Sequence, residues 1–133
     1  MHVVTEHEKY APLRAALGQD LRIEQVLGES AEGAAYLARD LTLDRRVLVK
    51  ALDRARADEA AVEAFAREAR VLASLSDPCV PAIHHAGSAG DFRYIVREPP
   101  EGPTLEERRR TGPLPQGDVV RIGLQILGAL HAA

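Results

Sequence analysis

A short glycine-rich segment is the first part of this sequence whose residue types suit chemistry. It spans Gly28-Glu29-Ser30-Ala31-Glu32-Gly33 and joins two stretches with strand-like alternation. Glycines in such a hairpin let backbone N–H groups come close to phosphate oxygens. A purely structural hairpin also requires glycine, so the segment alone leaves both interpretations open. A dinucleotide-binding fingerprint fits worse, because that motif opens a helix, whereas the residues from Gly33 onward predict a strand.

Lys50 and Glu68 are a candidate charged pair. Lys50 shares a predicted strand face with Leu48 and Leu52, and a lysine that extends to solvent is the alternative interpretation. Glu68 borders the apolar stripe of a predicted helix, and no cation lies three or four residues from it. A solvated carboxylate at the edge of the stripe is the alternative there. Because an unpaired carboxylate beside apolar surface is unfavourable, the sequence predicts that Lys50 and Glu68 approach within ion-pair distance.

The histidines and the cysteine do not predict a metal site. His84 and His85 are adjacent, so they lie on opposite strand faces, and His131 is remote in the sequence. No carboxylate cluster accompanies them at a chelating spacing. The single cysteine, Cys79, excludes an internal disulfide and a cysteine zinc cluster. We expect no metal site, a packing role for Cys79, and a cytoplasmic location.

The elements that must position these residues are short. Alternating residues predict five strands, and turn residues separate them. The predicted strands span 21–28, 33–40, 45–52, 81–87 and 92–98, with a hairpin loop over 88–91. The short connections favour antiparallel pairing.

Helical spacing predicts the remaining elements. One helix runs from Asp58 to Leu75 and ends at Asp77-Pro78. A short leading helix is expected within 6–17, limited to one or two turns by its proline. Capping-box spacing opens a helix at 104–110, and a last helix runs from about 118 to the terminus. The fold class is therefore α+β, a five-stranded antiparallel sheet with one packed helix.

Length and composition exclude several classes of protein. The chain has 133 residues, enough for one modest domain, and is 46% apolar and 28% charged, as expected for a globular protein. A net charge of −3 gives no support for nucleic-acid binding. No stretch approaches the roughly 20 apolar residues that span a bilayer, and the N-terminus is too charged for a signal peptide. We expect neither nucleic-acid binding nor membrane insertion.

Taken in order, these features resemble the N-terminal lobe of a bacterial eukaryotic-type serine/threonine protein kinase. The ordered set is the glycine-rich hairpin, the Lys50 strand, the Glu68 helix, and Val96-Arg97-Glu98 followed by Glu101-Gly102-Pro103-Thr104-Leu105. The resemblance covers about 21–133. It implies an N-terminal extension over 1–20, a kinase-like lobe over 21–98, a hinge over 99–103, and the first C-lobe helices over 104–133.

The resemblance also implies ATP with Mg²⁺ as the nominal ligand, together with a protein substrate or a regulated protein partner. Lys50 would hold the α- and β-phosphates, and the glycine-rich hairpin would cover them. The implied nucleotide-binding positions are Leu27, Gly28, Ser30, Gly33, Ala35, Leu48, Lys50, Glu68, Arg97, Glu98 and Pro100.

Four of those positions depart from the family pattern. Ser30 replaces the second glycine, and Leu48 replaces a small alanine where adenine would pack. Arg97 stands at the usually uncharged gatekeeper position, where it could also swing out or pair with an acid such as Glu68. Pro100 has no N–H to donate to adenine, unless the register is off by one, in which case Pro99 has the same defect. The four departures predict weakened nucleotide recognition.

The catalytic motifs of the family are absent from this sequence. It contains no His-Arg-Asp loop, no metal-binding Asn after it and no Asp-Phe-Gly. We therefore expect no catalytic residue in this chain and a sequence truncated before the catalytic loop, unable to catalyse phosphoryl transfer alone. The alternatives are a pseudokinase that serves as a regulatory or binding module, and an unrelated small α+β binding domain.

Overall fold

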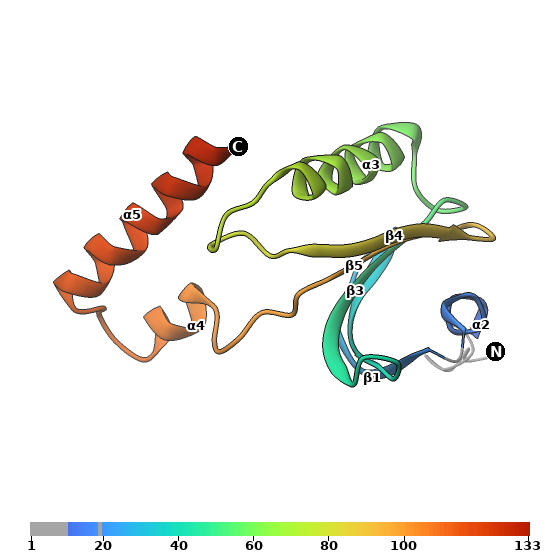
Figure 1. Ribbon diagram of the computed structural model, residues 1–133, viewed down its shortest axis with the longest axis horizontal. Helices are drawn as coiled ribbons and strands as arrows, with labels where there is room; N and C mark the ends of the chain where they lie inside the picture. Colours follow the sequence, from blue (N-terminus) through green and yellow to red (C-terminus); the bar gives the residue numbers. More distant parts are fainter. Residues whose placement is uncertain (1–10, 19) are drawn as a thin grey trace.

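A five-stranded antiparallel sheet with strand order β1-β2-β3-β5-β4 organises the molecule (Figure 1). The computed structural model describes residues 11–18 and 20–133. The strands are β1 Leu21–Glu29, β2 Gly33–Asp40, β3 Arg45–Asp53, β4 Ile83–Ala89 and β5 Phe92–Arg97. The helices are α2 Ala11–Leu17, α3 Glu59–Ser74, α4 Leu105–Arg110 and α5 Gln116–Ala132. The predicted α+β class and five-stranded sheet are confirmed.

Three predicted boundaries were wrong by two residues. The fourth strand begins at Ile83 and not at residue 81, and it continues to Ala89. Its hairpin to β5 turns at Gly90 and Asp91, with Ala89 paired to Phe92, because Gly90 adopts the positive φ of 57° that closes a tight turn. The last helix begins at Gln116, not near residue 118, since the Pro115 carbonyl already accepts the N–H groups of Asp118 and Val119.

The position of helix α3 is set by its N-terminal cap and by its stripe of apolar side chains. The Asp58 carboxylate accepts the N–H of Ala61 at 2.8 Å, which caps the first turn. Phe65 is buried against Leu52 and Ile95 of the sheet, with Val62 and Ala69 beside it. The helix ends at Ser74, because the next residue, Leu75, has extended backbone. The packing of Phe65 sets which side of α3 faces the sheet.

The two faces of the sheet are covered by different helices, as Figure 1 shows. We call the face that carries Leu48, Lys50, Leu52 and Ile95 the cleft face, and α3 lies over it. The opposite face, the back face, is covered by α2. Its buried core consists of Leu13, Leu17, Ala34, Tyr36, Ala38, Val47, Val49, Ala51 and Val96.

Packing of α2 was not predicted from the sequence. The expected leading helix over 6–17 is observed over Ala11–Leu17, and residues 6–10 lie outside the described part. Leu13 is fully buried and Leu17 nearly so. The last residues of the expected N-terminal extension are therefore part of the lobe's core.

Helices α4 and α5 follow the sheet and lie apart from it in Figure 1. Thr104 and Glu107 form the predicted capping box, with each side chain accepting the other residue's N–H. Arg108 contacts Asp118 at 3.3 Å and links the two helices. Six large apolar side chains of α5 are 50–66% exposed, namely Val119, Val120, Leu124, Ile126, Leu127 and Leu130, whereas Ile122 is half-buried. Among the described residues, no helix has the length and hydropathy needed to cross a membrane.

Candidate functional site

The β1–β2 hairpin can lie close to β3 because Gly33 has no side chain. A Cβ atom there would overlap the carbonyl oxygen of Ala51, and would lie 3.2 Å from the Leu52 Cα. Gly33 has no positive φ, so its role is close approach rather than an unusual backbone conformation. Gly28 has open space around it. Of the two glycines of the motif, Gly33 is therefore required for close approach to β3, whereas Gly28 is not.

Ser30 closes the hairpin with its own polar groups. Its N–H donates to the Gly33 carbonyl at 2.8 Å, and its Oγ accepts the N–H groups of Gly33 at 3.2 Å and Glu32 at 3.4 Å. Ser30 does not adopt a positive φ; among the described residues other than glycine, only Asp44 does. The serine that replaces the family's second glycine thus fits the turn without strain.

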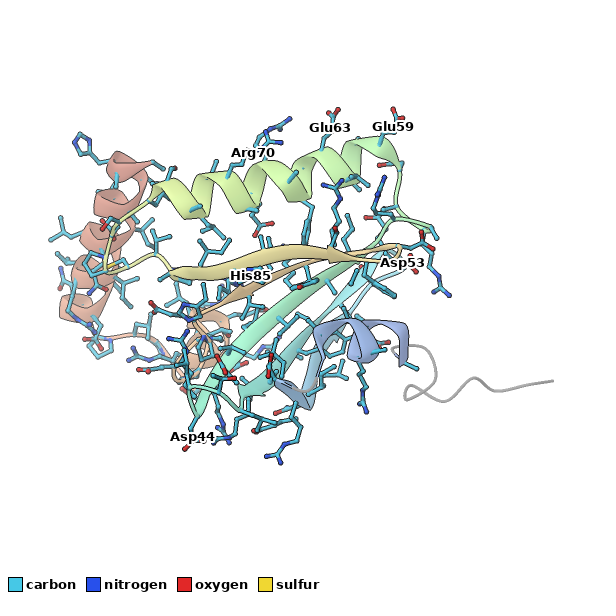
Figure 2. The ribbon with its side chains drawn as sticks, turned by 45° about the vertical axis from the view of Figure 1, so that its right-hand side comes forward. Asp44, Asp53, Glu59, Glu63, Arg70 and His85 are labelled. Carbon is cyan, nitrogen blue, oxygen red and sulfur yellow. The ribbon has the colours of Figure 1, made fainter. Side chains whose placement is uncertain are left out.

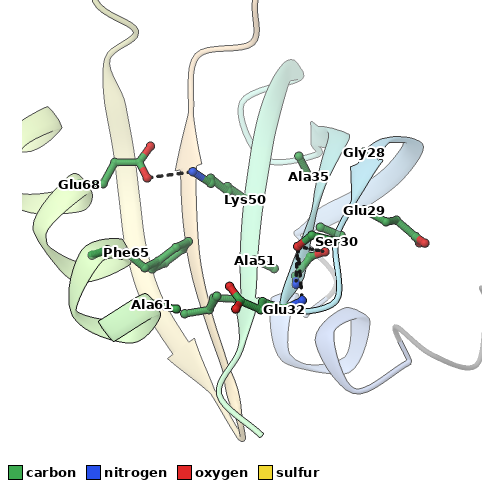
Figure 3. A pocket seen from close by; sticks show the side chains of 14 residues that line it. Gly28, Glu29, Ser30, Glu32, Ala35, Lys50, Ala51, Ala61, Phe65 and Glu68 are labelled. Carbon is green, nitrogen blue, oxygen red and sulfur yellow. Dashed lines mark hydrogen bonds and ion pairs between the residues drawn. The ribbon is translucent and has the colours of Figure 1, made fainter. Parts of the chain in front are cut away.

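Lys50 and Glu68 form the ion pair that the sequence predicted. The Lys50 Nζ lies 2.8 Å from the Glu68 Oε2, and both side chains are 40% exposed. Lys50 extends from β3 and Glu68 from α3, as Figure 3 shows. Glu68 has no cation at helical spacing, so this contact depends on the packing of α3 on the sheet.

A cleft of about 520 Å³ lies between the hairpin, β3 and α3. It contains six of the eleven implied nucleotide-binding positions, namely Gly28, Ser30, Gly33, Ala35, Lys50 and Glu68. Figure 3 shows the Lys50–Glu68 pair at one side of this cleft and the Ser30 turn at another. The cleft therefore joins backbone N–H groups, one ammonium group and carboxylates in one solvent-accessible space.

Leu27, Leu48 and Arg97 do not line this cleft. Leu27 is the extra residue at a register shift between Val26 and Gly28, where β1 bulges, and it is exposed. Leu48 is buried and pairs with Arg97 in the β3–β5 register. Leu48 and Arg97 are thus neighbours on the cleft face.

Arg97 makes no ion pair with the described residues, and its Nε is buried without a hydrogen-bond partner there. The alternative in which it pairs with Glu68 is not observed, because Glu68 is bound to Lys50. Arg97 as a whole is half-buried, so its side chain is not fully released to solvent. A charged group is therefore held beside Leu48.

Glu98 and Pro100 lie beyond the end of β5. The Glu98 N–H donates to the carbonyl of Ala82 at 2.9 Å, and the Glu98 side chain is exposed near Pro99 and Glu101. Pro100 is exposed and has no N–H. The structure thus separates these two positions from the six that line the cleft.

Several cleft residues were missed by sequence reasoning. Ala61, Ala64 and Phe65 of α3 line the cleft, as does Glu32 of the hairpin. Because the α3 residues are apolar, their types in the sequence indicated packing in the core and gave no indication of ligand binding. Glu32 lay inside the glycine-rich motif, and its acidic type was the only available sign. The described residues contain no group of three or more His, Cys, Asp or Glu side chains arranged to hold a metal.

Comparisons with known proteins agree on one family. The chain is 38% identical over 115 residues to the serine/threonine-protein kinase PrkC of Bacillus subtilis, covering 84% of this chain and 18% of PrkC. It is 34% identical over 125 residues to PknL of Mycobacterium tuberculosis, covering 92% of this chain and 31% of PknL. This chain is a homologue of the bacterial serine/threonine protein kinases. No protein-family model matches it.

The kinase homology and the fold agree. A third relative, the serine/threonine-protein kinase pkn2 of Myxococcus xanthus, is 33% identical over 125 residues, covering 91% of this chain and 15% of pkn2. The chain spans less than a third of the length of each of these kinases. Its five-stranded sheet with the packed helix α3 is that of a protein-kinase N-terminal lobe.

Proposed function

We propose that this chain is the N-lobe of a serine/threonine kinase-like domain and that its cleft receives the phosphates of ATP with Mg²⁺. The Lys50–Glu68 contact of 2.8 Å carries this proposal. A carboxylate that holds an ammonium group in one position lets that group meet a phosphate with little further loss of side-chain freedom. The partially exposed pair opens onto the hairpin, whose backbone lies on the same cleft.

Mg²⁺ would accompany the nucleotide and neutralise part of its negative charge. In this chain, Lys50 would contact the α- and β-phosphates, Glu68 would orient Lys50, and the hairpin would shield the phosphates from water. No residue here is assigned as a catalytic base, because the sequence has no His-Arg-Asp motif. We place the protein in the cytoplasm, with a protein substrate or a regulated protein as its partner.

The second candidate function is a pseudokinase, a regulatory or binding module with a degenerate adenine pocket. It is favoured by the pairing of buried Leu48 with Arg97, whose buried Nε has no hydrogen-bond partner among the described residues. At such a position an adenine ring would meet both added bulk and a guanidinium that must be desolvated. In addition, Pro100 lacks the backbone N–H that would donate a hydrogen bond to adenine at the hinge.

Calorimetry with Mg·ATP on the protein with its complete kinase domain tests the first proposal. We expect weak binding by the wild type and its loss in Lys50→Met. Arg70→Met is the control, because Figure 2 shows Arg70 on the side of α3 away from the sheet. Wild-type binding that is unaffected by Lys50→Met would contradict the assignment of the cleft to phosphate.

The triple variant Pro100→Val, Arg97→Met, Leu48→Ala tests the degenerate adenine pocket. One unsatisfied buried acceptor costs on the order of 1–3 kcal/mol, so restoring the hinge donor alone predicts about 5- to 150-fold tighter ATP binding. Unchanged affinity would remove the adenine-pocket argument and leave the fold assignment intact. An intact His-Arg-Asp and Asp-Phe-Gly in the parent gene would favour the enzyme over the pseudokinase.

A further inference from the structure

The turn of the glycine-rich hairpin already satisfies backbone N–H groups that a phosphate would need. Ser30 Oγ accepts from Gly33 N at 3.2 Å and from Glu32 N at 3.4 Å. Figure 3 shows these contacts converging on the hydroxyl at the cleft. An oxygen of Ser30 therefore stands where the hairpin would otherwise offer donors to an anionic ligand.

The hairpin cannot readily move away from this arrangement. Ser30 N–H donates to the Gly33 carbonyl at 2.8 Å, and Asp53 N–H donates to the Glu32 carbonyl at 2.7 Å. Gly33 lies so close to the Ala51 carbonyl that even a methyl group would overlap it. The turn is thus tied to β3 at both of its last residues, and a ligand must compete with Ser30 in place.

The charged side chains that line the cleft also disfavour the binding of phosphate. Three carboxylates and one ammonium group belong to the residues that line it, namely Glu29, Glu32, Glu68 and Lys50. Lys50 is bound to Glu68, whereas Glu32 is half-buried and forms no ion pair with the described residues. In Figure 3 the Glu29 carboxylate points away from Lys50, while Glu32 extends toward α3. A polyphosphate would approach Glu32 at close range.

We propose that Ser30 is a specificity-determining residue that lowers the affinity of the cleft for phosphate groups by occupying the hairpin N–H donors, and that Glu32 adds to this effect. The proposal rests on the proposed function, because it takes the cleft as the phosphate end of a nucleotide site. It assigns weak nucleotide binding partly to the hairpin, independently of Leu48, Arg97 and Pro100.

Calorimetry of the complete kinase-domain protein with Mg·ATP, Mg·ADP and adenosine tests the proposal. Ser30→Ala removes the hydroxyl, and Ser30→Gly also restores the family's residue type. One hydrogen-bond competitor predicts about three- to tenfold tighter binding of ATP, a smaller gain for ADP, and no change for adenosine. Glu32→Gln should tighten ATP binding about two- to fivefold, most at low salt. Glu63→Gln is the matched control with little effect, because Glu63 is exposed on the side of α3 away from the sheet (Figure 2) and does not line the cleft.

A second readout does not require a nucleotide. Amide hydrogen exchange of Glu32 and Gly33 should accelerate in Ser30→Ala relative to the wild type, while exchange in β3 stays unchanged. Equal ATP affinity in the wild type and both Ser30 variants would overturn the proposal, as would an equal gain for adenosine and ATP. If Lys50→Met abolishes ATP binding while the Ser30 variants change nothing, the proposed function stands and this inference fails. If neither the wild type nor any variant binds ATP, both fail.

Discussion

The two faces of the sheet are built from the same five strands but differ in what covers them. On the back face, α2 adds Leu13 and Leu17 to a continuous apolar core. On the cleft face, α3 packs through a smaller cluster centred on Phe65 and leaves an open cleft beside it. Alternation along each strand allows this division, since successive side chains point to opposite faces. One face therefore supplies stability, and the other keeps polar groups accessible.

Leu13→Ala should have the largest effect on the free energy of unfolding. Leu13 is 0% exposed, and truncating a buried leucine costs about 2–5 kcal/mol. Urea unfolding followed by circular dichroism measures the loss, with Leu43→Ala as the control because Leu43 is 60% exposed. A loss below about 1 kcal/mol would show that α2 is not part of the lobe's core.

Gly33→Ala comes next, because it tests the close approach between the hairpin and β3. The added methyl group overlaps the Ala51 carbonyl, so we expect a loss of about 1–3 kcal/mol, by analogy with overpacking of a core. Gly28→Ala is the matched control, since nothing lies within 4 Å of its added Cβ. Equal stability of the two variants in the same urea titration would contradict the structural role given to Gly33.

Lys50→Met should change stability by less than about 1 kcal/mol, even though it removes the ion pair to Glu68. Both side chains are 40% exposed, and solvent screening keeps such pairs weak. Thermal unfolding of Lys50→Met and Glu68→Gln, alone and combined, measures the coupling between them. A coupling energy well above about 1 kcal/mol would contradict this expectation. It would mean that the cleft face needs this ion pair for its stability, just as the back face needs Leu13.

Tyr94→Phe should have the smallest effect. The Tyr94 hydroxyl lies 3.5 Å from the His85 Nε2, at the limit of a hydrogen bond, and the His85 side chain is exposed. The aromatic ring still packs against the back-face core after the change. We expect a change within about 0.5 kcal/mol by urea unfolding; a loss above 1 kcal/mol would show that this contact supports the back face.

The elements themselves could be predicted because their signals are local. Alternation identified all five strands, apolar spacing from Asp58 identified α3, and the capping-box spacing at Thr104 marked the start of α4. The start of the fourth strand was predicted two residues early, at Pro81, which has no N–H to add to a ladder. The hairpin turn moved to Gly90 and Asp91 because backbone conformation, not polarity, decides where a tight turn closes.

The sequence by itself determined that Glu68 needed a cation from another element and that Lys50 stood on an apolar strand face, which was enough to predict their 2.8 Å contact. Tertiary structure alone decided the burial of Leu13, the overlap that excludes a side chain at Gly33, and the amide partners of Ser30. Those features depend on how closely separate segments approach. Residue types and spacing along one segment carry no information about that distance, because packing between elements sets it.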